Sequence, residues 1–312
     1  MTTSTLAEHA TPPAPPLPPS GRRRPNSRPS GRRPGRIRAK LAKIPLNLAV
    51  VFILVITVYP LIWLLLSSFK TNDEFVNGSV FALPETINWQ NYIDAWTTGN
   101  MGQYLSNSVL AVFPALALII LLGTAAGFAL EVMVWKGRNG VLLAFLVGIM
   151  VPGQMILLPL FTVYFQTGLS GSLWPLIITY TGIGLPLTVF MMATFFRSIP
   201  REVFEASTLD GAGIIRSFFT IGFPMVRNGI FTIALVQFFF IWNDLLIALT
   251  FTNSSSLRTI QVGLLNFTGE YGAMQYGPLF AAICINVFGT LVIYLALNQR
   301  VMKGLTAGSV KG

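Results

Sequence analysis

The charged side chains of the central part of this 312-residue sequence are concentrated in one short stretch, residues 200–224, between two long apolar segments. Charged side chains of both signs are costly inside a membrane, so we expect the stretch to lie outside it. On the residues alone it is a polar, amphipathic loop that connects two apolar segments. Its charged residues are Arg201, Glu202, Glu205, Asp210 and Arg216.

The same stretch contains the residues that begin and end helices. Pro200 can occupy the first turn of a helix, where a missing N–H is tolerated. Glu202 and Glu205 then lie near the helix N-terminus, where negative charge is favoured. Gly211 and Gly213 can end that helix and allow a turn before a second short amphipathic piece. The sequence predicts a helix–turn–helix that lies outside a membrane.

Several kinds of chemistry are excluded by the residues that the sequence lacks. It contains no Gly-x-x-x-x-Gly-Lys-Ser/Thr phosphate loop, so we expect no nucleotide to bind to this chain. Its one cysteine, Cys284, and one histidine, His9, cannot form an internal disulfide or a Cys/His metal site. We expect a chain that is not an enzyme and that binds neither cofactor nor metal.

The composition is that of a membrane protein. Hydrophobic residues make up 53% of the chain and charged residues only 10%, against about a quarter charged in soluble domains. Apolar segments of about 20 residues, the length that a bilayer requires, predict an all-α integral membrane protein with six transmembrane helices. The predicted spans are 46–67, 108–130, 141–163, 173–196, 225–250 and 279–298.

Basic residues set the expected orientation. Of the 21 Lys and Arg residues, all but Lys70 and Arg258 fall on one side of these six spans. The positive-inside rule then predicts a multi-pass membrane protein with both termini and the 200–224 loop in the cytoplasm. Residues 1–43 are rich in Pro and Arg and are expected to be a disordered tail. That tail either is merely solvated or adheres to anionic lipid, and we expect no nucleic-acid partner.

The 200–224 stretch resembles the signature loop of importer-type ABC transporter permeases. The family pattern is E-A-A, three residues, G, nine residues and I-x-L-P. The matching residues are Glu205, Ala206, Ser207, Gly211, Ile221, Gly222, Phe223 and Pro224, and Asp210 precedes the glycine. Ser207 replaces the second alanine of the pattern and Phe223 replaces leucine.

The resemblance implies a location in the inner membrane of a bacterial cell, and it implies that this loop couples the chain to a cytoplasmic ATPase. It further implies a transmembrane domain over residues 44–312, with the helix–turn–helix coupling loop between spans 4 and 5. The implied partners are a second related permease, two ATPase subunits that carry ATP and Mg, an extracytoplasmic sugar-binding protein and membrane lipid. By this resemblance the spans swing between inward-open and outward-open states, and Glu205 pairs with a cation of the ATPase.

Three further stretches resemble the maltose-type carbohydrate permeases within this family. They are 88–92 (Asn-Trp-Gln-Asn-Tyr), 242–245 (Trp-Asn-Asp-Leu) and the C-terminal ending 304–312. The first lies in a long outer loop, where Trp89, Tyr92 and Trp96 either meet the binding protein or anchor the loop at the membrane interface. The resemblance implies a sugar importer.

Polar side chains within the expected spans are candidates for the substrate path. They are Gln154, Tyr180, Trp242, Asn243 and Asp244. A carboxylate in an apolar segment is costly unless it faces protein or water. Asn, Asp and an aromatic ring suit the hydroxyls and apolar face of a sugar. Residues 242–244 could equally be a structural polar cluster at a helix end, and both interpretations stay open.

Alternative functions differ in their source of energy or in their solute. One is an importer of the same family for a different solute, such as an amino acid or phosphate. Another is an ion-coupled secondary carrier, although such carriers usually need a series of ionisable groups across the spans. Beyond Asp244 and Glu131 the spans contain no such series. A non-transporting membrane scaffold is the third alternative.

Overall fold

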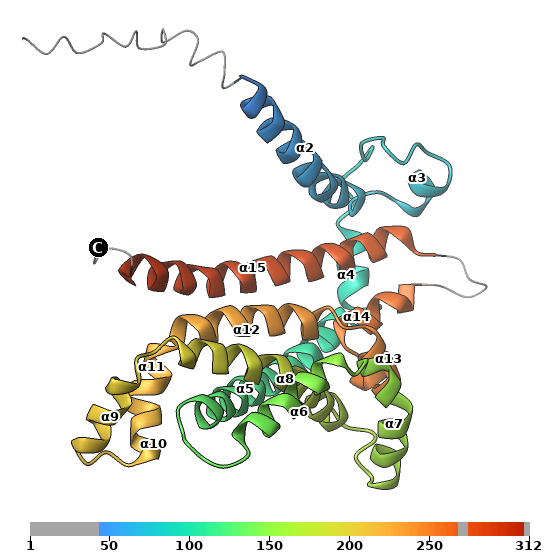
Figure 1. Cartoon of the computed structure of the whole chain (residues 1–312). Coiled ribbons are helices and arrows are strands. Elements are labelled where there is room, and N and C mark those ends of the chain that lie inside the picture. The colour runs from blue at the N-terminus through green and yellow to red at the C-terminus, as the bar shows by residue number, and fades with distance from the viewer. Residues whose placement is uncertain (1–43, 268–273, 309–312) are drawn as a thin grey trace, which may run out of the picture. The chain divides into compact units, whose positions relative to one another are not determined.

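The structure, a computed structural model, describes residues 44–267 and 274–308 (Figure 1). The basic tail expected at 1–43 and the last four residues of the C-terminal motif lie outside the described residues. The first long helix is α2 (Ile44–Ser67). Its N-terminal part belongs to a separate unit that ends at Ile56, and every contact reported below lies within the second unit, which begins at Thr57.

The second unit is built from helices joined by short turns. In chain order they are α3 (Asn72–Val76), α4 (Gln90–Trp96), α5 (Met101–Glu131), α6 (Arg138–Met150), η1 (Gly153–Ile156), α7 (Leu157–Gln166), α8 (Trp174–Arg197), α9 (Arg201–Leu209), α10 (Ile214–Ser217), η2 (Phe218–Gly222), α11 (Phe223–Met225), α12 (Arg227–Trp242), α13 (Leu246–Phe251), η3 (Ser255–Leu257), α14 (Ile260–Gly263), η4 (Leu264–Phe267) and α15 (Tyr276–Gly308).

Four helices are long and apolar enough to cross a membrane, and two bent pairs raise the number to six if each pair counts as one span. The predicted all-helical class is therefore confirmed, with four to six candidate membrane spans among the described residues. The four helical segments are Asn47–Ser67, Met101–Glu131, Trp174–Arg197 and Tyr276–Leu295.

The first bent pair lies where the sequence predicts one continuous span over 141–163. Arg138–Met150 and Gly153–Gln166 meet at an angle of 90°. Val151 is extended, with ψ of 117°, because the ring of Pro152 disfavours a helical conformation in the residue before it. The chain there is a broken element and not a straight helix.

The second departure concerns the span predicted over 225–250. The segments Ile214–Met225 and Arg227–Trp242 are bent by 73°. Helix α12 then ends at Trp242, and the chain resumes as the short α13 at Leu246. The break between these helices contains Asn243 and Asp244.

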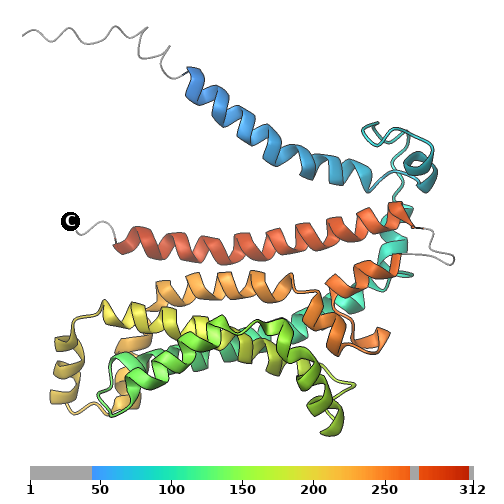
Figure 2. The ribbon, with the colours of Figure 1, turned by 45° about the vertical axis from the view of Figure 1, so that its right-hand side comes forward.

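The core of the unit is the close pairing of α5 with α8. Glycines on α5 permit this approach: a Cβ added to Gly127 would lie 2.9 Å from the backbone N of Ala193 on α8. Small residues commonly allow membrane helices to pack this closely. Helix α12 runs beside α8 and α15 (Figure 2). The α9–α10 hairpin lies at one end of this bundle, and α4, α13 and α14 lie at the other (Figures 1 and 2).

Candidate functional site

The 200–224 stretch forms a helical hairpin. Helix α9 follows Pro200 and ends with Asp210 as its C-cap. Gly211 then has φ of +78°, the left-handed conformation that side chains disfavour and that commonly ends helices. Helix α10 begins at Ile214, after Gly213 in an extended conformation.

A buried pair of hydroxyl groups joins the two arms of this hairpin. The Oγ atoms of Ser207 on α9 and Ser217 on α10 are 2.8 Å apart, and both side chains are buried. Ser207 is the position at which the sequence departs from the second alanine of the signature. The hydrogen bond gives this serine a structural role, because a buried hydroxyl requires a partner.

A cluster of aromatic rings lies beneath the hairpin. Phe128 on α5 lies at its centre, with ring centroids 5.4 Å from Phe196 on α8, 5.6 Å from Phe204 on α9 and 5.2 Å from Phe218 of η2. All three pairs are edge-to-face, a favourable arrangement of aromatic rings. The cluster therefore links both arms of the hairpin directly to the α5–α8 core.

Gly222 of the signature lies against the same cluster. A Cβ on Gly222 would lie 3.1 Å from the ring of Phe128 and 3.4 Å from that of Phe196. The neighbouring Ile221 is half-buried, and Pro224 is exposed at the start of α11. The second half of the signature thus packs against the core.

The outward side of the hairpin is exposed and partly apolar. Leu209 is 89% exposed and Ile215 is 72% exposed. Glu205, Ala206 and Asp210 are exposed as well. Exposed apolar residues grouped beside charged ones are typical of interaction surfaces.

Glu205 also borders a cavity with a volume of about 320 Å³. Glu131 and Arg197 line its wall and form an ion pair of 2.9 Å between the ends of α5 and α8. The remaining lining residues are Val132, Val134, Phe196, Ile199, Arg201, Phe204, Thr208 and Ile214.

Residues of α5, α8 and α9 line this cavity together. Glu205 is thus placed next to the Glu131–Arg197 ion pair and at the base of the exposed hairpin.

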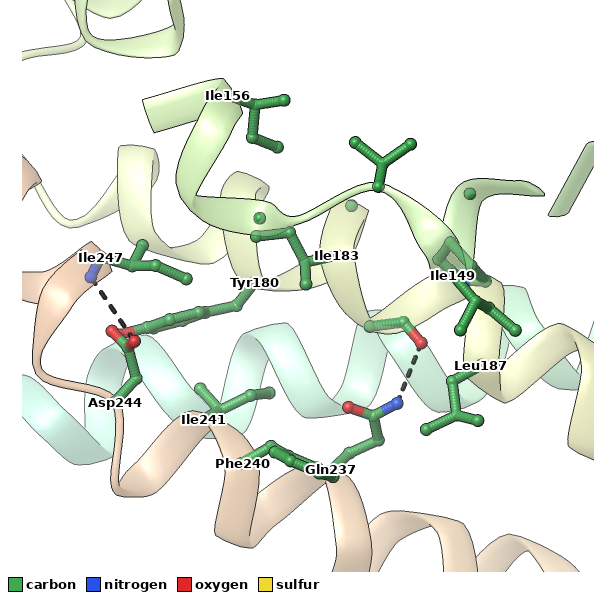
Figure 3. A pocket seen from close by; sticks show the side chains of 16 residues that line it. Ile149, Ile156, Tyr180, Ile183, Leu187, Gln237, Phe240, Ile241, Asp244 and Ile247 are labelled. Carbon is green, nitrogen blue, oxygen red and sulfur yellow. Dashed lines mark hydrogen bonds between the residues drawn. The ribbon is translucent and has the colours of Figure 1, made fainter. Parts of the chain in front are cut away.

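A larger cavity of 510 Å³ lies further along the bundle (Figure 3). It lies beside α8, the break at Pro152 and the break between α12 and α13. Its wall is mostly apolar and includes Ile183, Leu187, Phe240 and Ile241. Three polar side chains also line it: Tyr180, Gln237 and Asp244. A mostly apolar cavity with a few convergent polar groups is the usual form of a small-molecule site.

Tyr180 and Asp244 meet at one end of this cavity (Figure 3). The Tyr180 hydroxyl donates to Asp244 Oδ2 over 3.0 Å. The backbone N–H of Ala248 donates to the same carboxylate over 3.0 Å, and that of Ile247 over 3.5 Å. Asp244 therefore caps the first turn of α13 and also faces the cavity.

Gln237 lies on α12, apart from that pair (Figure 3). Its Nε2 donates to the Gly184 carbonyl over 2.9 Å and to Thr188 Oγ1 over 3.0 Å, which ties α12 to α8. Gln237 is not among the path residues that the sequence predicts. The signal that could have identified it is a lone amide within an apolar segment.

The other three candidates do not line this cavity. Trp242 is buried and donates from Nε1 to Asn286 Oδ1 on α15 over 3.2 Å. Asn243 is exposed and donates to the Phe239 carbonyl over 3.0 Å. Gln154 is exposed in η1, beside the lining residue Gly153.

At the opposite end of the bundle from the hairpin, the segment between α2 and α5 is held by polar contacts. Asn91 is buried and donates to the carbonyls of Ser68 and Lys70. The Tyr92 hydroxyl lies 2.7 Å from Ser68 Oγ. Trp89 is 62% exposed and Trp96 is 51% exposed, so both remain accessible to a partner or to lipid.

Glu74 organises the loop that contains α3. Its carboxylate accepts hydrogen bonds from the backbone N–H groups of Glu85 and Thr71 and from the Thr71 hydroxyl. These donors favour the ionised form, with the N–H of Glu85 contributing most, and they hold the pKa of the Glu74 carboxyl below its usual value.

Comparisons with known proteins agree on one family. Residues 119–303 match the family described as binding-protein-dependent transport system inner membrane component. The chain is 34% identical to the diacetylchitobiose uptake system permease protein NgcG of Streptomyces coelicolor, over 82% of this chain and 85% of that protein. It is 31% identical to the melibiose/raffinose/stachyose import permease protein MelC of Bacillus subtilis, over 81% of this chain and 91% of that protein.

The fold also matches a solved structure. A bacterial ABC transporter involved in the import of the acidic polysaccharide alginate superposes with a TM-score of 0.73 at 17% identity. The match covers 84% of this chain and 97% of that chain. At this identity the likeness concerns the fold alone.

Proposed function

The chain belongs to the family of binding-protein-dependent transport system inner membrane components, and we propose that it is the permease subunit of an ATP-driven sugar importer. One observation carries the sugar assignment. Two of the relatives, which match over more than four fifths of both chains, are named as permeases for diacetylchitobiose and for melibiose, raffinose and stachyose.

In this proposal the α9–α10 hairpin docks on a cytoplasmic ATPase. The exposed Leu209 and Ile215 supply apolar contact area, and Glu205 supplies a charge for a cation of the partner. The Phe128 cluster then transmits movement of the docked hairpin to α5 and α8, because rings in edge-to-face contact cannot slide without displacing one another. ATP and Mg belong to the ATPase subunits.

The same proposal places the sugar path along the 510 Å³ cavity. This chain contributes half of the path and a second, related permease contributes the other half. The cavity is bordered by the breaks at Pro152 and Asp244, where rigid helices give way to short connections that can re-orient. Tyr180 and Asp244 offer polar groups to sugar hydroxyls on an otherwise apolar wall.

The orientation follows from the distribution of basic residues. Both termini and the hairpin face the cytoplasm, and α4 with the exposed Trp89 and Trp96 faces outward, toward an extracytoplasmic sugar-binding protein. The arrangement of hairpin and α4 at opposite ends of the bundle supports this assignment (Figure 1).

Uptake measurements under separate control of ATP and ion gradients test the proposal. Cells expressing the complete importer should lose uptake of a radiolabelled sugar when ATP is depleted with the ion gradient kept intact. They should retain uptake when an ionophore collapses the gradient and ATP is maintained. The opposite pattern would favour an ion-coupled carrier and overturn the proposal.

A further inference from the structure

The 510 Å³ cavity contains one formally charged group. Among its lining residues Asp244 is the only Asp, Glu, Lys or Arg. The other two polar lining side chains are neutral: Tyr180 carries a phenol and Gln237 carries an amide. The electrostatic character of the cavity therefore depends on the carboxylate of Asp244.

No cation neutralises this carboxylate among the side chains that the structure describes. The ion pair found there joins Arg197 to Glu131, at the hairpin end of the bundle. The donors to Asp244 are the Tyr180 hydroxyl and the backbone N–H groups of Ile247 and Ala248. These neutral donors fix the position of the carboxylate and supply no positive charge to offset it.

Gln237 adds a second acceptor to the cavity. Its Nε2 is engaged by the Gly184 carbonyl and by Thr188 Oγ1. The atom that remains for a ligand is the amide Oε1, which can only accept. Asp244 and Gln237 together thus present acceptors, which suit the O–H and N–H donors of a ligand.

We propose that Asp244 makes this cavity select its substrate by charge, so that it accepts neutral or amino-bearing sugars and rejects acidic ones. The proposal rests on the proposed function, since it concerns the sugar that enters the path. A fixed charge discriminates by repelling a like charge, and repulsion is a common source of specificity. In a mostly apolar cavity the repulsion is weakly screened.

The fold itself does not determine this selectivity. The solved transporter with the same fold is involved in the import of an acidic polysaccharide. Because the same fold serves an acidic polysaccharide in that transporter, any selection of sugars by charge must come from side chains. In this cavity the charged side chain is that of Asp244.

Cysteine labelling measures the charge of the cavity without any need for transport. In a Cys284→Ala background, Gly182→Cys places a thiol on the cavity wall, where an added Cβ meets no atom within 4 Å. The assembled importer is treated with a cationic and an anionic methanethiosulfonate reagent, and the ratio of the two rates is measured. Asp244→Asn should lower the cation-to-anion ratio by about tenfold.

Ser255→Cys is the matched control, because Ser255 is exposed and does not line the cavity. Its rate ratio should be the same with Asp244 and with Asn at that position. The proposal would be overturned if Asp244→Asn left the ratio at Gly182→Cys unchanged, or if neither reagent reached that thiol.

Protection from labelling tests the choice of sugar. Cellobiose and the disaccharide of glucosamine should each slow labelling of Gly182→Cys, and the corresponding uronic-acid disaccharide should do so only after Asp244→Asn. Equal protection by the acidic and neutral disaccharides with Asp244 intact would overturn the proposal. Failure of the proposed function would instead appear as ATP-independent uptake, which these labelling rates do not measure.

Discussion

The hydroxyl of Ser207 lies 2.8 Å from the hydroxyl of Ser217, so a buried hydrogen bond joins α9 to α10 across the turn at Gly211. The hairpin is therefore held by its own polar contact as well as by the aromatic cluster beneath it. In the proposed function this bond would let both arms of the hairpin move as one body when a partner docks on it.

Removing one of these serines should weaken the hairpin. Ser207→Ala leaves the Ser217 hydroxyl buried without its partner, and we expect a loss of about 1 kcal/mol in the free energy of unfolding. The double variant Ser207→Ala/Ser217→Ala should cost less than the sum of the two single changes, because it removes both groups. Thermal unfolding of the purified protein gives the change in the free energy of unfolding for the two single variants and the double variant. If the two single changes add up to the double change, the hydrogen bond is contradicted.

Phe128 should be required to transmit movement of the hairpin to α5 and α8. Phe128→Ala removes the ring that contacts α8, α9 and η2, and we expect a loss of about 3 to 5 kcal/mol in stability. Phe128→Leu keeps most of the volume and should retain the fold but uncouple ATP hydrolysis from uptake. Leu122→Ala, an exposed position on the same helix, is the control and should behave as wild type in both assays.

Position 211 should not tolerate a side chain in place of Gly211, whereas Gly213 should be replaceable by alanine. A Cβ meets no atom within 4 Å at either glycine, so their backbone conformations make the difference. Gly211 has φ of +78° and Gly213 has φ of −66°. Gly211→Ala should cost about 1 to 2 kcal/mol, and Gly211→Pro should abolish uptake.

Gly213→Ala is the matched control for these substitutions and should preserve uptake. Membrane insertion should be unaffected in all three variants, as measured by their abundance in the membrane fraction. Normal uptake with Gly211→Pro would contradict the role of the turn.

Acid should loosen the loop that contains α3. The pKa of Glu74 is lowered in the folded protein from its usual value of 4.5, so the unfolded loop binds protons more tightly. The stabilisation by Glu74 is therefore complete above pH 4.5 and is lost as the pH falls through the lower, folded pKa. Hydrogen exchange at the Glu85 amide, corrected for intrinsic rates, should accelerate in this range.

Glu74→Gln is the control for this prediction, because it cannot titrate. In this variant the corrected exchange rate at Glu85 should be high at pH 6 and should change little on acidification. An unchanged rate in the wild-type protein between pH 6 and pH 3.5 would show that the carboxylate does not hold the loop.

The sequence predicts the helical class and the position of the hairpin because local signals determine both. The apolar segments fix the membrane helices, and Pro200 and Gly211 bound α9 through their own backbone preferences. The breaks are harder to predict: Pro152 indicates a bend, but its angle of 90° depends on the packing of α6 against α8 and of α7 against α13. The cavity could not be predicted from the sequence, since Tyr180 comes from α8, Gln237 from α12 and Asp244 from the break between α12 and α13.

The central claim is that the hairpin connects this chain to an ATPase, and co-purification tests it most directly. The tagged chain is solubilised gently from its native membrane, and its partners are identified by mass spectrometry. We predict that a second permease and an ATPase accompany the wild-type chain, and that Glu205→Lys combined with Gly211→Pro removes the ATPase but not the second permease. Equal recovery of the ATPase with that variant, or a wild-type chain that purifies alone, would contradict the account.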